Sequence, residues 1–141
     1  PSASSGAFAY TGTAGYVADD TVSLGEGYWI KFPAPSSVNI TGVQAGKDTF
    51  EIAAGWNLIG AVSGSVDTGA VLQVPPGLVA SPYYAYGAGY AASDSLRPGH
   101  GYWVKAASAG QLILAPIALR PPAVRRGAGP ARQALKQERG R

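Results

Sequence analysis

An internal repeat is the feature of this sequence that most constrains its fold. Shifting the chain by 74 positions aligns residues 15–31 with residues 89–105 without a gap, and nine of the 17 aligned positions are identical. The alignment ends on a motif that occurs twice, GYWIK at 27–31 and GYWVK at 101–105. A repeat of this kind indicates two copies of one structural unit.

The similarity extends beyond the ungapped alignment on both sides. Upstream, FAY at 8–10 matches YAY at 84–86 when two residues are dropped. Downstream, VNITG at 38–42 corresponds to QLILA at 111–115. We therefore expect each unit to contain related strands before and after its Gly-Tyr-Trp motif.

The two copies are not equally complete. A long segment that contains GWNLIG at 55–60 precedes the second copy, whereas only seven residues precede Phe8 in the first. We expect about one and a half repeats in this chain, which suggests that it is cut inside a repeat. The expected divisions are an N-terminally incomplete first unit at 1–46, a complete second unit at 47–117 and a basic tail at 118–141.

Short aromatic and β-branched runs between glycine and proline residues predict an all-β fold. YWIKF at 28–32 and YWVKA at 102–106 are such runs, as are GWNLIGAV and QLILAPIAL. The 20 glycines and 11 prolines suit a protein with many turns. The one helical candidate is 67–73, with Asp67 as its N-cap and Pro75 as its stop. We expect the two units to pack as a sandwich or a small barrel.

The Tyr-Trp pair of each motif allows two interpretations. Adjacent residues of a strand point to opposite faces, so one member of each pair faces the core. We expect the Trp of each pair, and also Trp56, to pack in the core, because Trp is heavily buried on average. The alternative is a ligand-binding or interface surface of exposed aromatic side chains. Its candidates are Tyr28, Trp29, Tyr84, Tyr86, Tyr102 and Trp103.

Side chains that commonly carry enzyme chemistry are scarce. The chain has no cysteine, and its single histidine, His100, aligns with Glu26 of the first copy. The absence of cysteine excludes a thiol nucleophile and a cysteine-ligated metal. We interpret the repeat equivalents Asp20 and Asp94 as turn residues. We therefore predict a non-enzyme with no catalytic residue, no cofactor and no metal site; a hydrolase would need two carboxylates about 5–10 Å apart in a cleft.

Basic charge gathers at the C-terminal end. Residues 120–141 carry seven Lys or Arg and one Glu, whereas residues 1–119 carry four basic and seven acidic side chains. The composition of the tail predicts disorder and a linker role, with binding of nucleic acid or an acidic glycan as the alternative. We expect no nucleic-acid partner. No apolar run reaches the roughly 18 residues of a membrane span.

Several ordered motifs resemble a known type of module. AGWNLIG, PPGLV, YYAYGAGY, LRPGHGYWVK and GQLIL, in this order, are similar to a tandem β-rich repeat module of secreted and cell-surface bacterial proteins, and the resemblance covers roughly residues 7–115. The resemblance implies an extracellular or cell-surface location and no known catalytic activity. It carries over no ligand and no binding residue. In that family a secretion-sorting domain often follows, and the tail at 118–141 lacks its strand pattern.

Two functions are consistent with these features. The leading hypothesis is a non-catalytic structural or adhesive module of an exported protein, which holds copies of itself or another extracellular protein through β surfaces. The alternative is a carbohydrate-binding module that uses exposed Tyr and Trp side chains.

The missing GWNLIG strand of the first unit bears on self-assembly. Either residues 52–62 serve both units in one merged sheet, or the tail covers the open edge, or a strand from a neighbouring molecule fills it and builds oligomers or filaments. The candidate donors are the arm at 1–7 and the apolar stretch at 111–119. Within that stretch the donor residues would be Leu112, Ile113, Leu114 and Ile117.

Overall fold

The computed structural model of the chain describes residues 2–39 and 41–116. Strands dominate these residues, and all the pairings between them are antiparallel, which confirms the predicted all-β fold. In chain order the strands are β1 (Ala7–Thr11), β2 (Gly15–Asp19), β3 (Asp48–Ile52), β4 (Gly55–Gly60), β5 (Val66–Asp67), β6 (Leu72–Val74), β7 (Tyr83–Tyr86), β8 (Tyr90–Ser93), β9 (Ser95–Leu96), β10 (Gly101–Ala106) and β11 (Gly110–Leu114).

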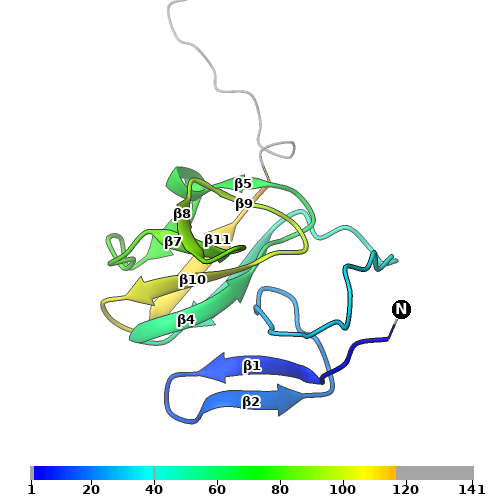
Figure 1. The fold of residues 1–141 in the computed structure, drawn as a ribbon. Helices are drawn as coiled ribbons and strands as arrows, with labels where there is room; N and C mark the ends of the chain where they lie inside the picture. Colours follow the sequence, from blue (N-terminus) through cyan, green and yellow to red (C-terminus); the bar gives the residue numbers. More distant parts are fainter. Residues whose placement is uncertain (1, 40, 117–141) are drawn as a thin grey trace, which may run out of the picture.

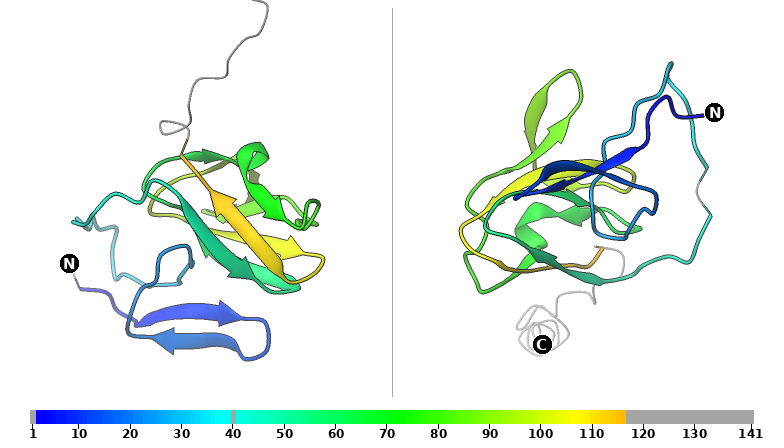
Figure 2. Two further views of the ribbon diagram at one scale, coloured as in Figure 1. Left: turned by 180° about the vertical axis from the view of Figure 1, so that it is seen from behind. Right: turned by 90° about the horizontal axis from the view of Figure 1, so that it is seen from below.

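Two packed sheets form the second unit. One has the order β4-β10-β7-β8 and the other has the order β3-β11-β6, while β5 and β9 form a short extra pair. Figure 2 shows β11 on one side of the sheet that contains β4 and β10. The arrangement is sandwich-like, and the sheets of the described residues do not close into a barrel.

The hydrophobic core lies between these two sheets. Burial alternates along β10, so that Tyr102 and Val104 are almost fully buried while Trp103 is not. All the buried hydrophobic residues of the described chain belong to the second unit. They are Ile52, Ile59, Val62, Val66, Val71, Leu78, Tyr83, Leu96, Tyr102, Val104, Ala106, Leu112 and Leu114.

The first unit is a smaller sheet beside the sandwich. The β1–β2 hairpin pairs with the segment at 25–31, because Phe8 and Trp29 exchange backbone hydrogen bonds of 3.0 and 2.9 Å. Figure 1 places this hairpin below β4 and β10. Tyr10 of β1 contacts the Trp103 ring, so the hairpin lies against the face of the β4–β10 sheet that points away from the core.

Equivalent tyrosines make the same contact in both units. The Ser23 N–H donates to the Tyr28 hydroxyl at 2.9 Å, and the Arg97 N–H donates to the Tyr102 hydroxyl at 2.8 Å. Ser23 aligns with Arg97, and Tyr28 aligns with Tyr102. The tyrosine of the motif therefore fixes the loop that leads into its own strand, which explains why both copies keep it.

Equivalent lysines are also held alike. The Lys31 N–H donates to Ser5 Oγ, and the Lys105 N–H donates to Ser81 Oγ, both at 2.9 Å. The two serines are 76 positions apart, which is the offset that aligns FAY with YAY. The repeat is therefore a repeat of hydrogen bonds as well as of sequence.

Strand β4 contacts both units. It pairs with β10 along its whole length, and it also bonds to the first unit through Gly27 N–H to Leu58 O (3.1 Å) and Gly60 N–H to Gly25 O (2.9 Å). Gly25 and its counterpart Gly99 have φ values of 83° and 78°, which glycine adopts readily. The first unit has no β4 of its own within the described residues, and β4 of the second unit bonds to part of it.

Two local expectations need correction. Residues 38, 39, 41 and 42 form no strand, although their counterparts belong to β11 and the residue after it. Strand β11 lies between β3 and β6, and the first unit has no counterpart of either, so the segment has nothing to pair with. The helical candidate at 67–73 is a single 3₁₀ turn at Thr68–Ala70, capped by Asp67 as expected, and its last two residues, Leu72 and Gln73, belong to β6.

Among the described residues, no helix has the length and apolar character needed to cross a bilayer. The expectations about the basic tail concern residues outside the described part of the chain.

Candidate aromatic binding site

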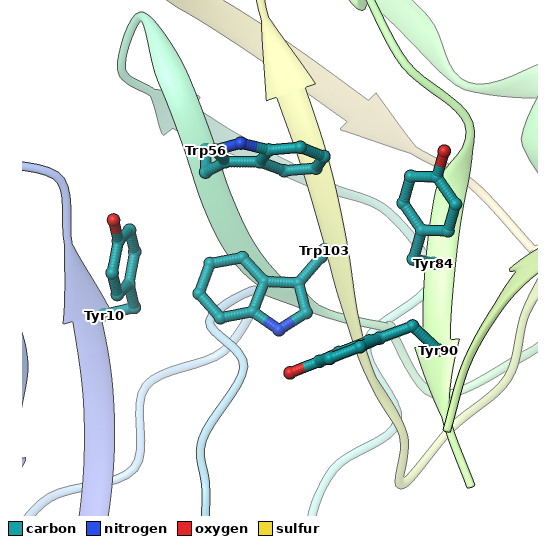
Figure 3. A pocket seen from close by; sticks show the side chains of 5 residues that line it. All are labelled: Tyr10, Trp56, Tyr84, Tyr90 and Trp103. Atoms are coloured by element: carbon teal, nitrogen blue, oxygen red, sulfur yellow. The ribbon is translucent and has the colours of Figure 1, made fainter. Parts of the chain in front are cut away.

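An aromatic pocket opens between the two units, on the face of β10 that points away from the core. Its volume is about 490 Å³. Figure 3 shows Trp103 in the middle, with the other four rings around it. We call it the aromatic pocket; its lining residues are Tyr10 of β1, Trp56 of β4, Tyr84 of β7, Tyr90 of β8 and Trp103 of β10.

Strand alternation explains why these side chains converge. In β10, Tyr102 points into the core, so its neighbour Trp103 points to the opposite face. In β7, Tyr83 is the core residue and Tyr84 faces the pocket. Trp56 pairs with Lys105, two positions from Trp103, and so lies on the pocket side of β4.

The expectation that tryptophans pack in the core is wrong. Trp56 is 42% exposed, and Trp29 and Trp103 are half-buried between the two units. Tyrosine takes the core position instead, because its hydroxyl reaches a backbone N–H in the loop that leads into its strand, as Tyr102 does with Arg97. Tyr102 is 2% exposed and is therefore a core residue and not a ligand-binding one.

Each motif tryptophan packs against a tyrosine of the other unit. Trp103 contacts Tyr10 with ring centroids 4.7 Å apart and an interplanar angle of 74°. Trp29 contacts Tyr86 in nearly the same way, at 4.9 Å and 71°. Tyr10 aligns with Tyr86, so the two contacts are reciprocal. Edge-to-face pairs of this kind stabilise an interface by about 0.5–1.5 kcal/mol each beyond the area they bury.

The reciprocal contacts create a pocket on only one side. Trp56 closes it, with its ring 6.1 Å from that of Tyr84, and Trp56 belongs to the GWNLIG strand. The first unit has no counterpart of this strand within the described residues. The pocket is therefore a consequence of the unequal repeats.

A lysine lies close to one of the rings that line the pocket. Lys105 Nζ lies 6.0 Å from the centroid of the Trp56 ring, within range of a cation–π contact. None of the described lining side chains is acidic. The lining tyrosines offer hydroxyl groups that both donate and accept hydrogen bonds.

The six aromatic candidates lie in four different places. Tyr84 and Trp103 line the pocket, while Trp29 and Tyr86 contact each other beside it. Tyr28 is half-buried and donates a hydrogen bond to Glu26. Tyr102 is in the core, as described above.

Sequence reasoning missed part of the site. Tyr10 and Tyr90 were not among the candidates, and Trp56 was expected to be buried. The available signal for Tyr10 was its alignment with Tyr86, and the signal for Tyr90 was its alignment with Tyr16. Neither alignment indicates that the two units pack against each other, which is what brings these side chains into one pocket.

The proposed strand-donor residues lie inside the fold. Strand β11 is the central strand of its sheet, and Leu112 and Leu114 are fully buried. Donating β11 to a neighbouring molecule would remove these side chains from the core of their own chain. The expectation that Leu112, Ile113 and Leu114 act as strand donors is therefore wrong. Ile117 lies outside the described residues.

Within residues 2–39 and 41–116, no three His, Cys, Asp or Glu side chains lie close enough to hold a metal ion. The chain matches no protein-family model, no curated protein and no solved structure. The similarity to secreted repeat modules therefore stays a prediction.

Proposed function

We propose that this chain is a non-catalytic adhesive module that binds a neutral carbohydrate in the aromatic pocket. The observation that carries the proposal is one open pocket of about 490 Å³ lined by five aromatic side chains, two of them tryptophans. Ligand sites typically combine an apolar, aromatic lining with a few polar groups that orient the ligand. A sugar ring matches this, because it has an apolar C–H face and a rim of hydroxyl groups.

The geometry favours carbohydrate binding over a purely structural role. The five aromatic side chains line a concavity built within one chain and not a flat patch. Trp56 is 42% exposed, so one large ring is available for stacking without unfolding. An extracellular or cell-surface location, where polysaccharides are abundant, belongs to the same proposal.

The position of Lys105 argues against a cationic ligand. Aromatic cages often bind quaternary ammonium groups. Here the Lys105 ammonium already lies 6.0 Å from the Trp56 ring, and the described lining carries no carboxylate to offset a second positive charge. A neutral sugar meets no such repulsion.

Calorimetric titration of the full chain tests the proposal. The probes are cellohexaose, xylohexaose and mannohexaose, with choline as the cationic comparison. We expect saturable binding of at least one hexasaccharide and none of choline. Trp56→Ala should weaken that binding at least about tenfold, which corresponds to about 1.4 kcal/mol.

Leu72→Ala is the matched control, because Leu72 is 60% exposed and lies in β6, outside the pocket. It should bind as the unchanged chain does. Absence of saturable binding to every hexasaccharide, or equal affinity in Trp56→Ala, would show that the pocket is not a carbohydrate site.

A further inference from the structure

The first unit leaves a face uncovered where the second unit buries its core. Leu96 and Val104 are both 0% exposed, whereas their repeat counterparts Val22 and Ile30 are 65% and 42% exposed. Tyr102 is buried and its counterpart Tyr28 is half-buried. We call the surface formed by Val22, Tyr28 and Ile30 the outer face.

A free strand edge adjoins the outer face. Trp29 exchanges both of its backbone hydrogen bonds with Phe8. Backbone groups alternate between the two edges of an antiparallel strand, so those of Tyr28 and Ile30 face the other edge. Their counterparts in β10 pair with β4. Among the described residues, no strand pairs with Tyr28 or Ile30.

The segment of the first unit that corresponds to β11 is also without the neighbouring strands that β11 has. Asn39 is the counterpart of Leu112, which is fully buried in β11. Asn39 is exposed and lies outside any strand, because nothing in the described part of the first unit corresponds to the strands that flank β11. The open edge, the outer face and this segment thus all lack counterparts of β3, β4 and β6.

We propose that the outer face binds a polypeptide segment of the kind that residues 47–78 represent. Its GWNLIG-like strand would pair with the edge at Tyr28 and Ile30, and its apolar side chains would cover the outer face. The second unit defines this chemistry, because the same segment performs both tasks there. This surface is separate from the aromatic pocket, so either proposal can fail alone.

A second copy of this chain fits the outer face less well. The strands that would have to be donated are already in use, since Ile52 and Ile59 are 4% and 2% exposed in their own core. Exchange would therefore expose one core in order to cover another. A polypeptide segment whose GWNLIG-like strand is not already part of another core could bind the outer face without exposing buried side chains.

Fusion to the full chain tests the proposal. Ala3 aligns with Val79, so a copy of residues 47–78 joined directly to Ala3 reproduces the spacing of the second unit. The readout is amide hydrogen exchange. In the unfused chain the Tyr28 and Ile30 amides should exchange faster than the Trp29 amide, which bonds to Phe8 O. In the fusion they should slow at least about a hundredfold, as expected when open edge amides enter a sheet.

Two controls keep the test specific. A scrambled copy of residues 47–78 should give no protection, and Ile30→Asp in the fusion should remove the protection while leaving β10 exchange unchanged. Unchanged exchange at Tyr28 and Ile30 in the fusion, or equal protection by the scrambled copy, would overturn the proposal. Light scattering that shows the unfused chain dimerising, with loss of the dimer in Ile30→Asp, would also overturn it in favour of a second copy.

Discussion

Two core tyrosines differ in what their hydroxyl groups contact. Tyr102 accepts a hydrogen bond from the Arg97 N–H at 2.8 Å. Tyr83 is 5% exposed, and its hydroxyl is buried without a hydrogen-bond partner in the described part of the chain. A buried polar group stabilises the fold only when it is paired, and otherwise its desolvation costs free energy.

The same substitution should therefore act differently at the two positions. Tyr102→Phe leaves the Arg97 N–H without its acceptor and should lower the free energy of unfolding by about 1–2 kcal/mol. Tyr83→Phe removes a hydroxyl that is already unpaired, and the stability should be unchanged or higher. Urea denaturation measures both, and an equal loss in the two variants would contradict this account of the core.

Burial of Tyr83 also predicts a dependence on alkaline pH. Burial raises the pKa of the Tyr83 hydroxyl from 10.0 to about 12. Between these values the unfolded chain has released this proton and the folded chain still holds it, so stability falls as pH rises. Urea denaturation from pH 9 to 12 should show a steeper decline for the unchanged chain than for Tyr83→Phe. Parallel declines would show that Tyr83 titrates normally.

At the scale of elements, the junction between β4 and the first unit depends on close backbone packing. A Cβ added to Gly27 would lie 2.7 Å from Ile59 O and 2.8 Å from Leu58 Cγ. A Cβ added to its counterpart Gly101 would meet nothing nearer than 3.6 Å. The repeat thus contains a crowded glycine and an uncrowded one at equivalent positions.

Gly27→Ala should loosen the first unit while the second stays folded. The Ile59 backbone cannot move away without disturbing its pairing with Tyr102. Hydrogen exchange should show faster exchange at Trp29 and in β1, with β10 and β11 still protected. Gly101→Ala is the control and should leave exchange in both units unchanged; equal effects of the two substitutions would contradict the proposed junction.

Strand pairing explains how far the elements were predictable. Strands β10 and β11 have apolar or aromatic runs and a partner strand on each side, and β4 pairs with β10 along its whole length; the sequence predicts all three. Residues 38, 39, 41 and 42 belong to a segment with a similar pattern, but they have no partner strand in the described part of the chain and form no strand. Local sequence reports the tendency to form a strand, whereas the neighbouring strands decide the outcome.

The site was less predictable than the fold. Alternation along GYWVK shows that Tyr102 and Trp103 face opposite ways, but not which of them faces the core. That choice depends on the Arg97 N–H available to Tyr102 and on Tyr10 of the other unit, which contacts Trp103. Both are contacts between distant parts of the chain, and the repeat alone does not reveal them.

At the scale of the whole molecule, two unequal copies of one unit meet through their aromatic faces. The complete unit holds the hydrophobic core, and the incomplete unit contributes Tyr10 to the pocket and leaves its outer face open. We propose that the aromatic pocket binds a carbohydrate and that the outer face binds a strand-bearing polypeptide. An adhesive protein that links a glycan to a neighbouring protein would use both.

The most direct test of the carbohydrate proposal uses the three tryptophans as internal reporters. Trp56 and Trp103 line the pocket, whereas Trp29 packs against Tyr86 outside it. In a ¹⁵N-labelled sample, each indole N–H gives its own NMR signal. Titration with the best-bound hexasaccharide should shift the Trp56 and Trp103 signals in a saturable manner and leave Trp29 nearly unchanged. Equal shifts of all three signals, or a shift of Trp29 alone, would contradict binding in the aromatic pocket.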